Sequence, residues 1–167
     1  LVTNFRGFFQ ALRWPIDKTL VAIEGFLQSL PPPLVFVLTW LIGWQVSDRK
    51  TTTFVLVSMA FIGFIGAWSQ AITTLALVIT AVFFCTITGI PLGIIISRSK
   101  RAESIIRPLM DAMQTTPSFV YLIPVVMLFG VGNVPGIIVT IIFALPPLVR
   151  LTNLGMRQVP SDVIEAT

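Results

Sequence analysis

The chain has 167 residues, of which 55% are hydrophobic and 11% charged, and its formal net charge is +4. Soluble domains carry about a quarter charged residues, so this composition excludes an ordinary water-facing surface and predicts a protein of the lipid bilayer. The eleven basic residues gather in short patches between apolar segments, which is typical of loops at an anionic membrane face and not of nucleic-acid binding. The absence of His and the single Cys exclude a disulfide framework and a metal cluster.

Residues 1–30 mix aromatic and aliphatic side chains with basic and acidic ones at roughly helical spacing. This pattern predicts an amphipathic segment, which lies either along the membrane surface or, as a soluble tail, on its own protein. Pro31-Pro32-Pro33 ends the segment and suits the start of the next helix, because Pro is tolerated at the first helical position.

Residues 31–158 are predicted to form about five transmembrane helices, so the fold class is all-α and polytopic. The first span is short for a bilayer, whose hydrocarbon core of about 30 Å needs about 20 helical residues. The predicted spans are Leu34–Val46, Thr52–Trp68, Ala71–Ser97, about Ile105–Phe129, and Ile137–Val149.

Several residues in these spans carry structural expectations. Gly63 and Gly66 predict a small-residue face for close helix packing, and Pro91 predicts a kink or a loosened last turn in the third span. Tryptophans near the span ends fit interfacial anchors better than a cation-binding aromatic cage; these are Trp40, Trp44 and Trp68.

The loop charges predict an orientation. Basic residues occur at 49–50, 98–101 and 150–157, whereas the loops at 69–70 and 130–136 have none. With five alternating spans, the basic loops share one face, which the positive-inside rule places in the cytoplasm. The N-terminus is then outside and the C-terminal end inside, although Arg6, Arg13 and Lys18 lie on the side that the rule disfavours.

The sequence offers little for catalysis, since it has no nucleophile–base pair and no metal-ligand spacing. Charge in the fourth segment is the stronger signal, because ionisable residues at membrane depth are costly and usually functional. Arg107 and Asp111 stand four apart and are expected to pair on one helix face. They are either functional charges inside the membrane or a structural pair at the cytoplasmic surface.

A polar cluster follows where the fourth segment enters the membrane. Its residues either line a translocation path or hydrogen-bond to neighbouring helices, as polar residues in spans commonly do. The cluster consists of Gln114, Thr115, Thr116, Ser118 and Tyr121.

The last residues, 159–167, form a polar, proline-introduced helix start after the apolar segments. We expect this stretch to begin a cytoplasmic segment that continues beyond Thr167.

Five stretches carry a family resemblance: 66–71, 74–78, 106–117, Asn133-Val134-Pro135-Gly136 and Phe143-Ala144-Leu145-Pro146-Pro147. Together they resemble the permease subunit of the proline/glycine betaine ABC importers. The similarity runs from about Phe5 to the end, and the Asp-Ala-Met-Gln-Thr-Thr-Pro run is fairly specific to that family. Val159-Pro160 with Ile164-Glu165-Ala166 resembles the opening of the cytoplasmic motif of importer permeases, although Thr167 stands where that motif has a second Ala.

The resemblance implies a type I ABC importer transmembrane domain in the bacterial plasma (inner) membrane. It implies a pair of permease copies (a homodimer), cytosolic ABC ATPase subunits, and an extracytoplasmic substrate-binding protein that delivers glycine betaine or proline betaine. Glu165 and Ala166 would open the segment that couples ATPase closure to translocation. The chain itself would be no enzyme and hold no cofactor, since ATP and Mg would bind the ATPase. The alternative is an ATP-independent osmolyte or ion channel.

Overall fold

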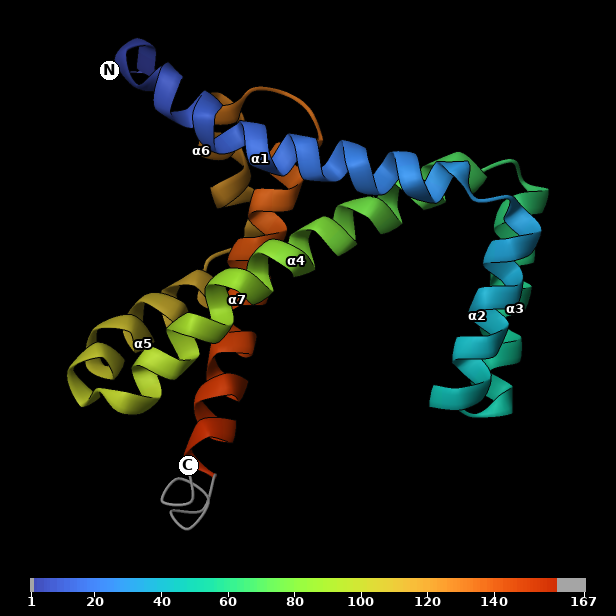
Figure 1. Ribbon diagram of the computed structural model, residues 1–167. Coiled ribbons are helices and arrows are strands. Elements are labelled where there is room, and N and C mark those ends of the chain that lie inside the picture. Colours follow the sequence, from blue (N-terminus) through green and yellow to red (C-terminus); the bar gives the residue numbers. More distant parts are fainter. Residues whose placement is uncertain (1, 159–167) are drawn as a thin grey trace. The chain divides into compact units, whose positions relative to one another are not determined.

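The computed structural model describes the backbone of residues 2–158 and the side chains of residues 9–158. Its described part consists of helices and short connections, without strands, which confirms the predicted all-α class. The helices are α1 (Val2–Ser29), α2 (Pro32–Val46), α3 (Arg49–Phe64), α4 (Trp68–Arg98), α5 (Lys100–Thr115), α6 (Ser118–Phe129) and α7 (Asn133–Arg157) (Figure 1). The chain divides into two compact units: one holds residues 18–77, and the other holds the preceding part of α1 together with residues 78–158.

The unit of residues 18–77 is centred on a helical hairpin of α2 and α3, which lie side by side (Figure 1). Pro31 is extended and Pro32 occupies the first helical position, as the proline run predicts. Gly43 sets the hairpin spacing, because a Cβ there would lie 2.7 Å from Cγ2 of the buried Thr52. The rings of Phe36 and Trp68 stack with 5.8 Å between their centroids.

The second predicted span is shorter than expected. Gly66 has a φ of +76°, a left-handed conformation that ends the helical path, so α3 stops at Phe64 and α4 begins at Trp68. A Cβ on Gly63 would meet nothing within 4 Å in the structure. Among the described residues, no helix packs on Gly63 or Gly66, and Gly66 makes a turn, so the predicted packing face stays a prediction.

The second unit brings together α4, α5, α6 and α7. Both α5 and α6 pack against α7. A Cβ on Gly89 would lie 2.8 Å from Cδ2 of Leu148, and one on Gly93 would lie 2.5 Å from Cβ of Thr152. Because both glycines meet α7 in the same sequence order, α4 and α7 run parallel, with their C-terminal ends at the same end of the unit.

Within the residues that the structure describes, the candidate spans number fewer than the predicted five. Two helices, α4 and α7, are long and apolar enough to cross a membrane, and up to four spans result if each of two bent helix pairs counts as one. The pairs are α1 from Phe9 with α2, bent by 100°, and α5 with α6, bent by 99°. The predicted fourth span is thus broken, and α3, with 16 residues, is too short to qualify.

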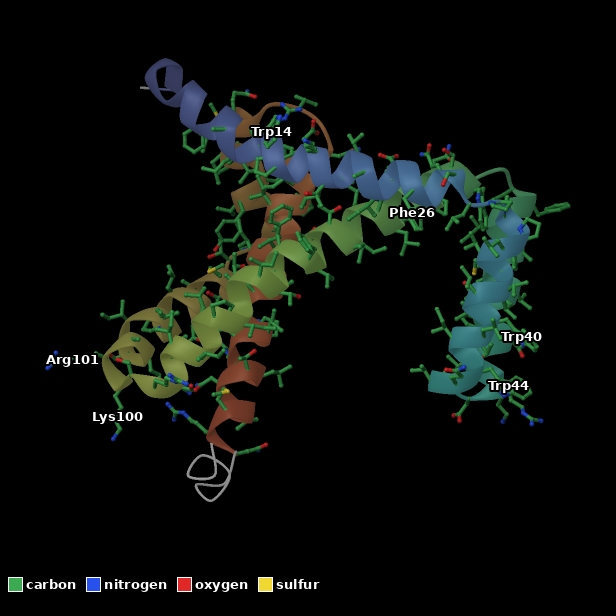
Figure 2. The ribbon with its side chains drawn as sticks, in the orientation of Figure 1. Trp14, Phe26, Trp40, Trp44, Lys100 and Arg101 are labelled. Carbon is green, nitrogen blue, oxygen red and sulfur yellow. The ribbon has the colours of Figure 1, made fainter. Side chains whose placement is uncertain are left out.

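The N-terminal segment is helical, as predicted, and contacts its own protein. Ile16 and Leu20 of α1 are buried, whereas Trp14, Val21 and Phe26 leave more than 60% of their surface exposed. Trp14 and Phe26 project from α1 in Figure 2. The helix therefore combines a packed face with an apolar face that is open to lipid or to a partner.

Candidate functional site

The bend between α5 and α6 is set by Pro117. A residue before Pro is pushed away from helical geometry, and Thr116 accordingly has φ −84° and ψ 128°. Pro117 is extended as well, and α6 begins at Ser118. The predicted polar cluster therefore sits on a sharp corner of the backbone.

Three hydroxyls of that cluster converge on one carbonyl. Thr115 Oγ1, Thr116 Oγ1 and Tyr121 Oη donate to the carbonyl oxygen of Ala112, over 3.2, 2.9 and 3.2 Å. The Thr116 N–H donates to the same oxygen over 3.2 Å. Pro117 has no N–H to continue the helical ladder, and the three hydroxyls add to the Thr116 N–H on the carbonyl one turn before the end of α5. The hydrogen bonds lie within the bend and not between distant helices.

The remaining members of the cluster, Gln114 and Ser118, are exposed. Tyr121 also reaches α7, because its ring meets Phe143 edge to face with centroids 5.9 Å apart. This ring contact connects the bend between α5 and α6 to α7. A role of these residues in lining a translocation path stays a prediction.

Beside the corner, α5 and α7 are joined by ion pairs. Asp111 pairs with Arg150, and Glu103 pairs with Arg157 at 2.7 Å. Arg107 approaches Glu103 at 3.9 Å. The predicted pairing of Arg107 with Asp111 is therefore wrong, because α7 supplies a closer cation for the Asp111 carboxylate. The pairs follow an antiparallel register, in which 103 meets 157 and 111 meets 150.

These pairs border an open cleft of about 410 Å³. Its apolar floor is a cluster of Ile96, Met110 and Val149, which joins α4, α5 and α7. The Oδ1 atom of Asn153 is buried in the cleft lining and has no hydrogen-bond partner among the described residues. The full lining is Ile96, Glu103, Arg107, Met110, Asp111, Val149, Arg150, Asn153, Leu154 and Arg157.

The cleft is partly solvated, since roughly half of the Asp111 and Arg150 side-chain surface is exposed. Exposed ion pairs contribute about 0–1 kcal/mol each to stability, so their main effect here is to fix which parts of α5 and α7 face each other. Sequence spacing contained a signal for the cleft: Glu103, Arg107 and Asp111 repeat every four residues, and Arg150 and Arg157 stand seven apart. Both spacings place charges on one helix face.

The opposite end of the same unit holds the turn between α6 and α7. The Arg13 guanidinium donates to the carbonyl oxygen of Phe129 over 2.8 Å, and the Phe9 ring meets the Phe129 ring edge to face at 5.4 Å. Gly130, with φ +85°, lies directly beneath the guanidinium. Arg13 thus stabilises the C-terminal end of α6, where a cation is favourable. This contact gives Arg13 a structural role within the unit.

Glu165, Ala166 and the rest of the predicted coupling segment lie outside the described residues. Among the residues that are described, no group of three or more His, Cys, Asp or Glu side chains is placed to hold a metal ion. The interactions that define the site are therefore ion pairs, hydrogen bonds from hydroxyls to a carbonyl, and close helix packing.

Comparison with known proteins identifies relatives over the whole chain. Residues 89–167 match the family described as binding-protein-dependent transport system inner membrane component. The chain is 58% identical, over all 167 residues, to the glycine betaine/proline betaine transport system permease protein ProW of Escherichia coli, covering 47% of it. It is 37% identical over its full length to the glycine betaine transport system permease protein OpuAB of Bacillus subtilis, covering 59% of that protein.

A third relative, the glycine betaine/carnitine transport permease protein GbuB of Listeria monocytogenes, is 39% identical over 99% of this chain and 60% of its own length. The predicted resemblance to betaine importer permeases is confirmed. The chain spans about half the length of the curated relatives that it matches.

Proposed function

We propose that this chain, whose residues 89–167 belong to the inner membrane components of binding-protein-dependent transport systems, is part of the permease of an ATP-driven importer for glycine betaine or proline betaine. The observation that carries the proposal is the 58% identity to ProW across every residue of the chain. The helical, apolar structure agrees with a membrane permease. ATP hydrolysis is assigned to a separate cytosolic ATPase, and substrate delivery to an extracytoplasmic binding protein, with two permease copies in the assembly.

We place the cleft at the cytoplasmic face. The parallel α4 and α7 bring the basic residues at their C-terminal ends together, whereas the turn at 130–132 lies at the opposite end. The positive-inside rule then places the C-terminal end of α7 in the cytoplasm and the α6–α7 turn outside. The basic residues at the cytoplasmic end are Arg98, Lys100, Arg101, Arg107, Arg150 and Arg157.

This orientation gives the cleft a mechanical role. The C-terminal end of α7 leads directly into the segment with Glu165 and Ala166, which we assign to ATPase docking. The Glu103–Arg157 and Asp111–Arg150 pairs connect α7 to α5, and Tyr121–Phe143 connects α7 to α6. Movement of the docked segment is therefore passed through α7 to the corner at Pro117.

Uptake in cells tests the proposal. The intact permease gene is expressed with its ATPase and binding protein in a bacterium that lacks betaine uptake. Labelled glycine betaine is expected to enter only when all three components are present. Uptake that persists unchanged after deletion of the ATPase gene would support an ATP-independent channel and contradict the importer assignment.

A further inference from the structure

The turn between α2 and α3 carries a basic and aromatic cluster with no role in the proposed transport cycle. Arg49 and Lys50 are the first two residues of α3, and the Arg49 guanidinium carbon lies 4.9 Å from the centre of the Trp44 ring. Such a cation–π contact fixes the position of the guanidinium. Trp40 packs edge to face on Trp44, with centroids 5.9 Å apart. Trp44 lies near the turn of the hairpin, and Trp40 lies about one helical turn before it in α2 (Figure 2).

The same turn forms an open hollow of about 460 Å³, lined by Arg49, Lys50, Thr53 and Phe54. The Thr53 hydroxyl donates to the Arg49 carbonyl oxygen over 2.8 Å and is thus engaged within α3. Phe54, which is 72% exposed, supplies apolar surface to the hollow. The surface that lines the hollow is mostly apolar, and the residues of two cations, Arg49 and Lys50, border it.

The backbone adds to the positive potential. Asp48 precedes α3 but makes no side-chain capping hydrogen bond, so it leaves the first N–H groups of the helix uncapped. The N-terminal end of a helix favours an anion. None of the ion pairs within residues 9–158 includes Arg49 or Lys50. Asp48, Arg49 and Lys50 together leave the turn with a net charge of +1.

α2 has no buried residue and both helices of the hairpin expose large apolar side chains, which suits contact with lipid. The two helices, of 15 and 16 residues, are about 22–24 Å long, which is less than the hydrocarbon thickness of about 30 Å. The two cations at the turn consequently lie close to the level at which lipid headgroups meet the hydrocarbon. An anionic headgroup there neutralises charge that would otherwise meet the apolar core.

We propose that the α2–α3 turn is a binding site for an anionic phospholipid, with the lipid phosphate held by Arg49 and Lys50 and an acyl chain on Phe54. The charge of the turn selects the headgroup, and its apolar surface selects a lipid over a free anion. By the positive-inside rule, the two basic residues of the turn favour the cytoplasmic leaflet, where anionic lipids are available. The site does not depend on the substrate of the importer.

Tryptophan quenching by brominated lipids measures this site directly. The full-length protein, with every tryptophan except Trp44 replaced by Phe, is placed in bilayers of brominated phosphatidylglycerol or brominated phosphatidylcholine. Phosphatidylglycerol is expected to associate about fivefold more strongly near Trp44, the effect of about one well-placed basic residue. The R49Q/K50Q variant should lose this preference. The K100Q/R101Q variant is the matched control, since it removes an adjacent basic pair at another exposed turn (Figure 2), and should retain it.

Equal quenching by the two lipids would overturn the proposal. An equal loss in the two basic-pair variants would also overturn it, since the effect would then be a general surface potential. Displacement of phosphatidylglycerol by inorganic phosphate at the same concentration would show an anion site and not a lipid site. If the single-tryptophan protein does not fold, native mass spectrometry counts the phosphatidylglycerol retained by the wild-type protein and by each variant, with the same expected order.

Discussion

At the scale of single residues, glycines show how little room separates the helices of the second unit. Gly93 lets α4 approach α7 so closely that an added Cβ would lie 2.5 Å from Cβ of Thr152 and 3.1 Å from the Val149 carbonyl oxygen. A backbone atom cannot move aside as a flexible side-chain end can. The spacing of α4 and α7 therefore depends on the absence of a side chain at this position.

Gly93→Ala is expected to destabilise the intact protein by about 1–3 kcal/mol, because overpacking forces the two helices apart. Gly63→Ala is the matched control, since its Cβ meets nothing within 4 Å and Ala favours a helix. Thermal unfolding of the purified protein in detergent measures both. A Gly93→Ala protein as stable as the Gly63→Ala protein would contradict the packing of α4 on α7.

At the scale of helices, the cleft pairs connect α5 with α7 across long stretches of sequence. Asp111 and Arg150 are 39 residues apart, and Glu103 and Arg157 are 54 apart. The sequence suggested a local pair of Arg107 with Asp111, because spacing along one helix reveals only neighbours on that helix. Which helix lies opposite is set by tertiary packing, through the apolar floor of Ile96, Met110 and Val149.

A charge exchange tests this connection. Asp111→Arg alone places two cations together and is expected to lower betaine uptake for each ATP hydrolysed by the assembled importer. The double variant D111R/R150D restores an opposite pair in the reversed order and should recover most of that ratio. Arg107→Gln serves as the control, because its contact with Glu103 is long and its side chain is 69% exposed. Failure of the double variant to improve on Asp111→Arg would exclude a role for the pair in coupling.

The prediction of the fold from sequence has the same limit: it finds local features and not tertiary packing. Hydropathy located the long apolar helices well: the predicted spans Ala71–Ser97 and Ile137–Val149 lie inside α4 and α7. It did not reveal that the segment around Pro117 turns by 99°, because an apolar run has the same hydropathy whether it is straight or bent. The Thr116-Pro117 pair indicated that the helix is interrupted there. The size of the bend depends on the packing of α5 and α6 against α7.

At the scale of the whole molecule, the proposed function requires that the conformational change of the ATPase is transmitted through residues 159–167 to α7. Glu165 and Ala166 carry this step in the prediction from sequence. Replacing Glu165 with Gln in the intact protein is expected to weaken ATPase association, because it removes a charge from the docking segment. Co-purification of the ATPase with the permease measures the effect. Asp111→Asn, placed in the cleft and outside the docking segment, is the control and should leave association intact.

The central claim is that these helices belong to an importer driven by ATP. The most direct measurement is accumulation of labelled glycine betaine by proteoliposomes that contain the full-length permease, its ATPase and its binding protein. With ATP on the ATPase side, betaine on the cytoplasmic side of the membrane is predicted to rise above its concentration on the side of the binding protein. Without ATP, no gradient should form. Betaine that merely equilibrates, at the same rate with and without ATP, would contradict the claim.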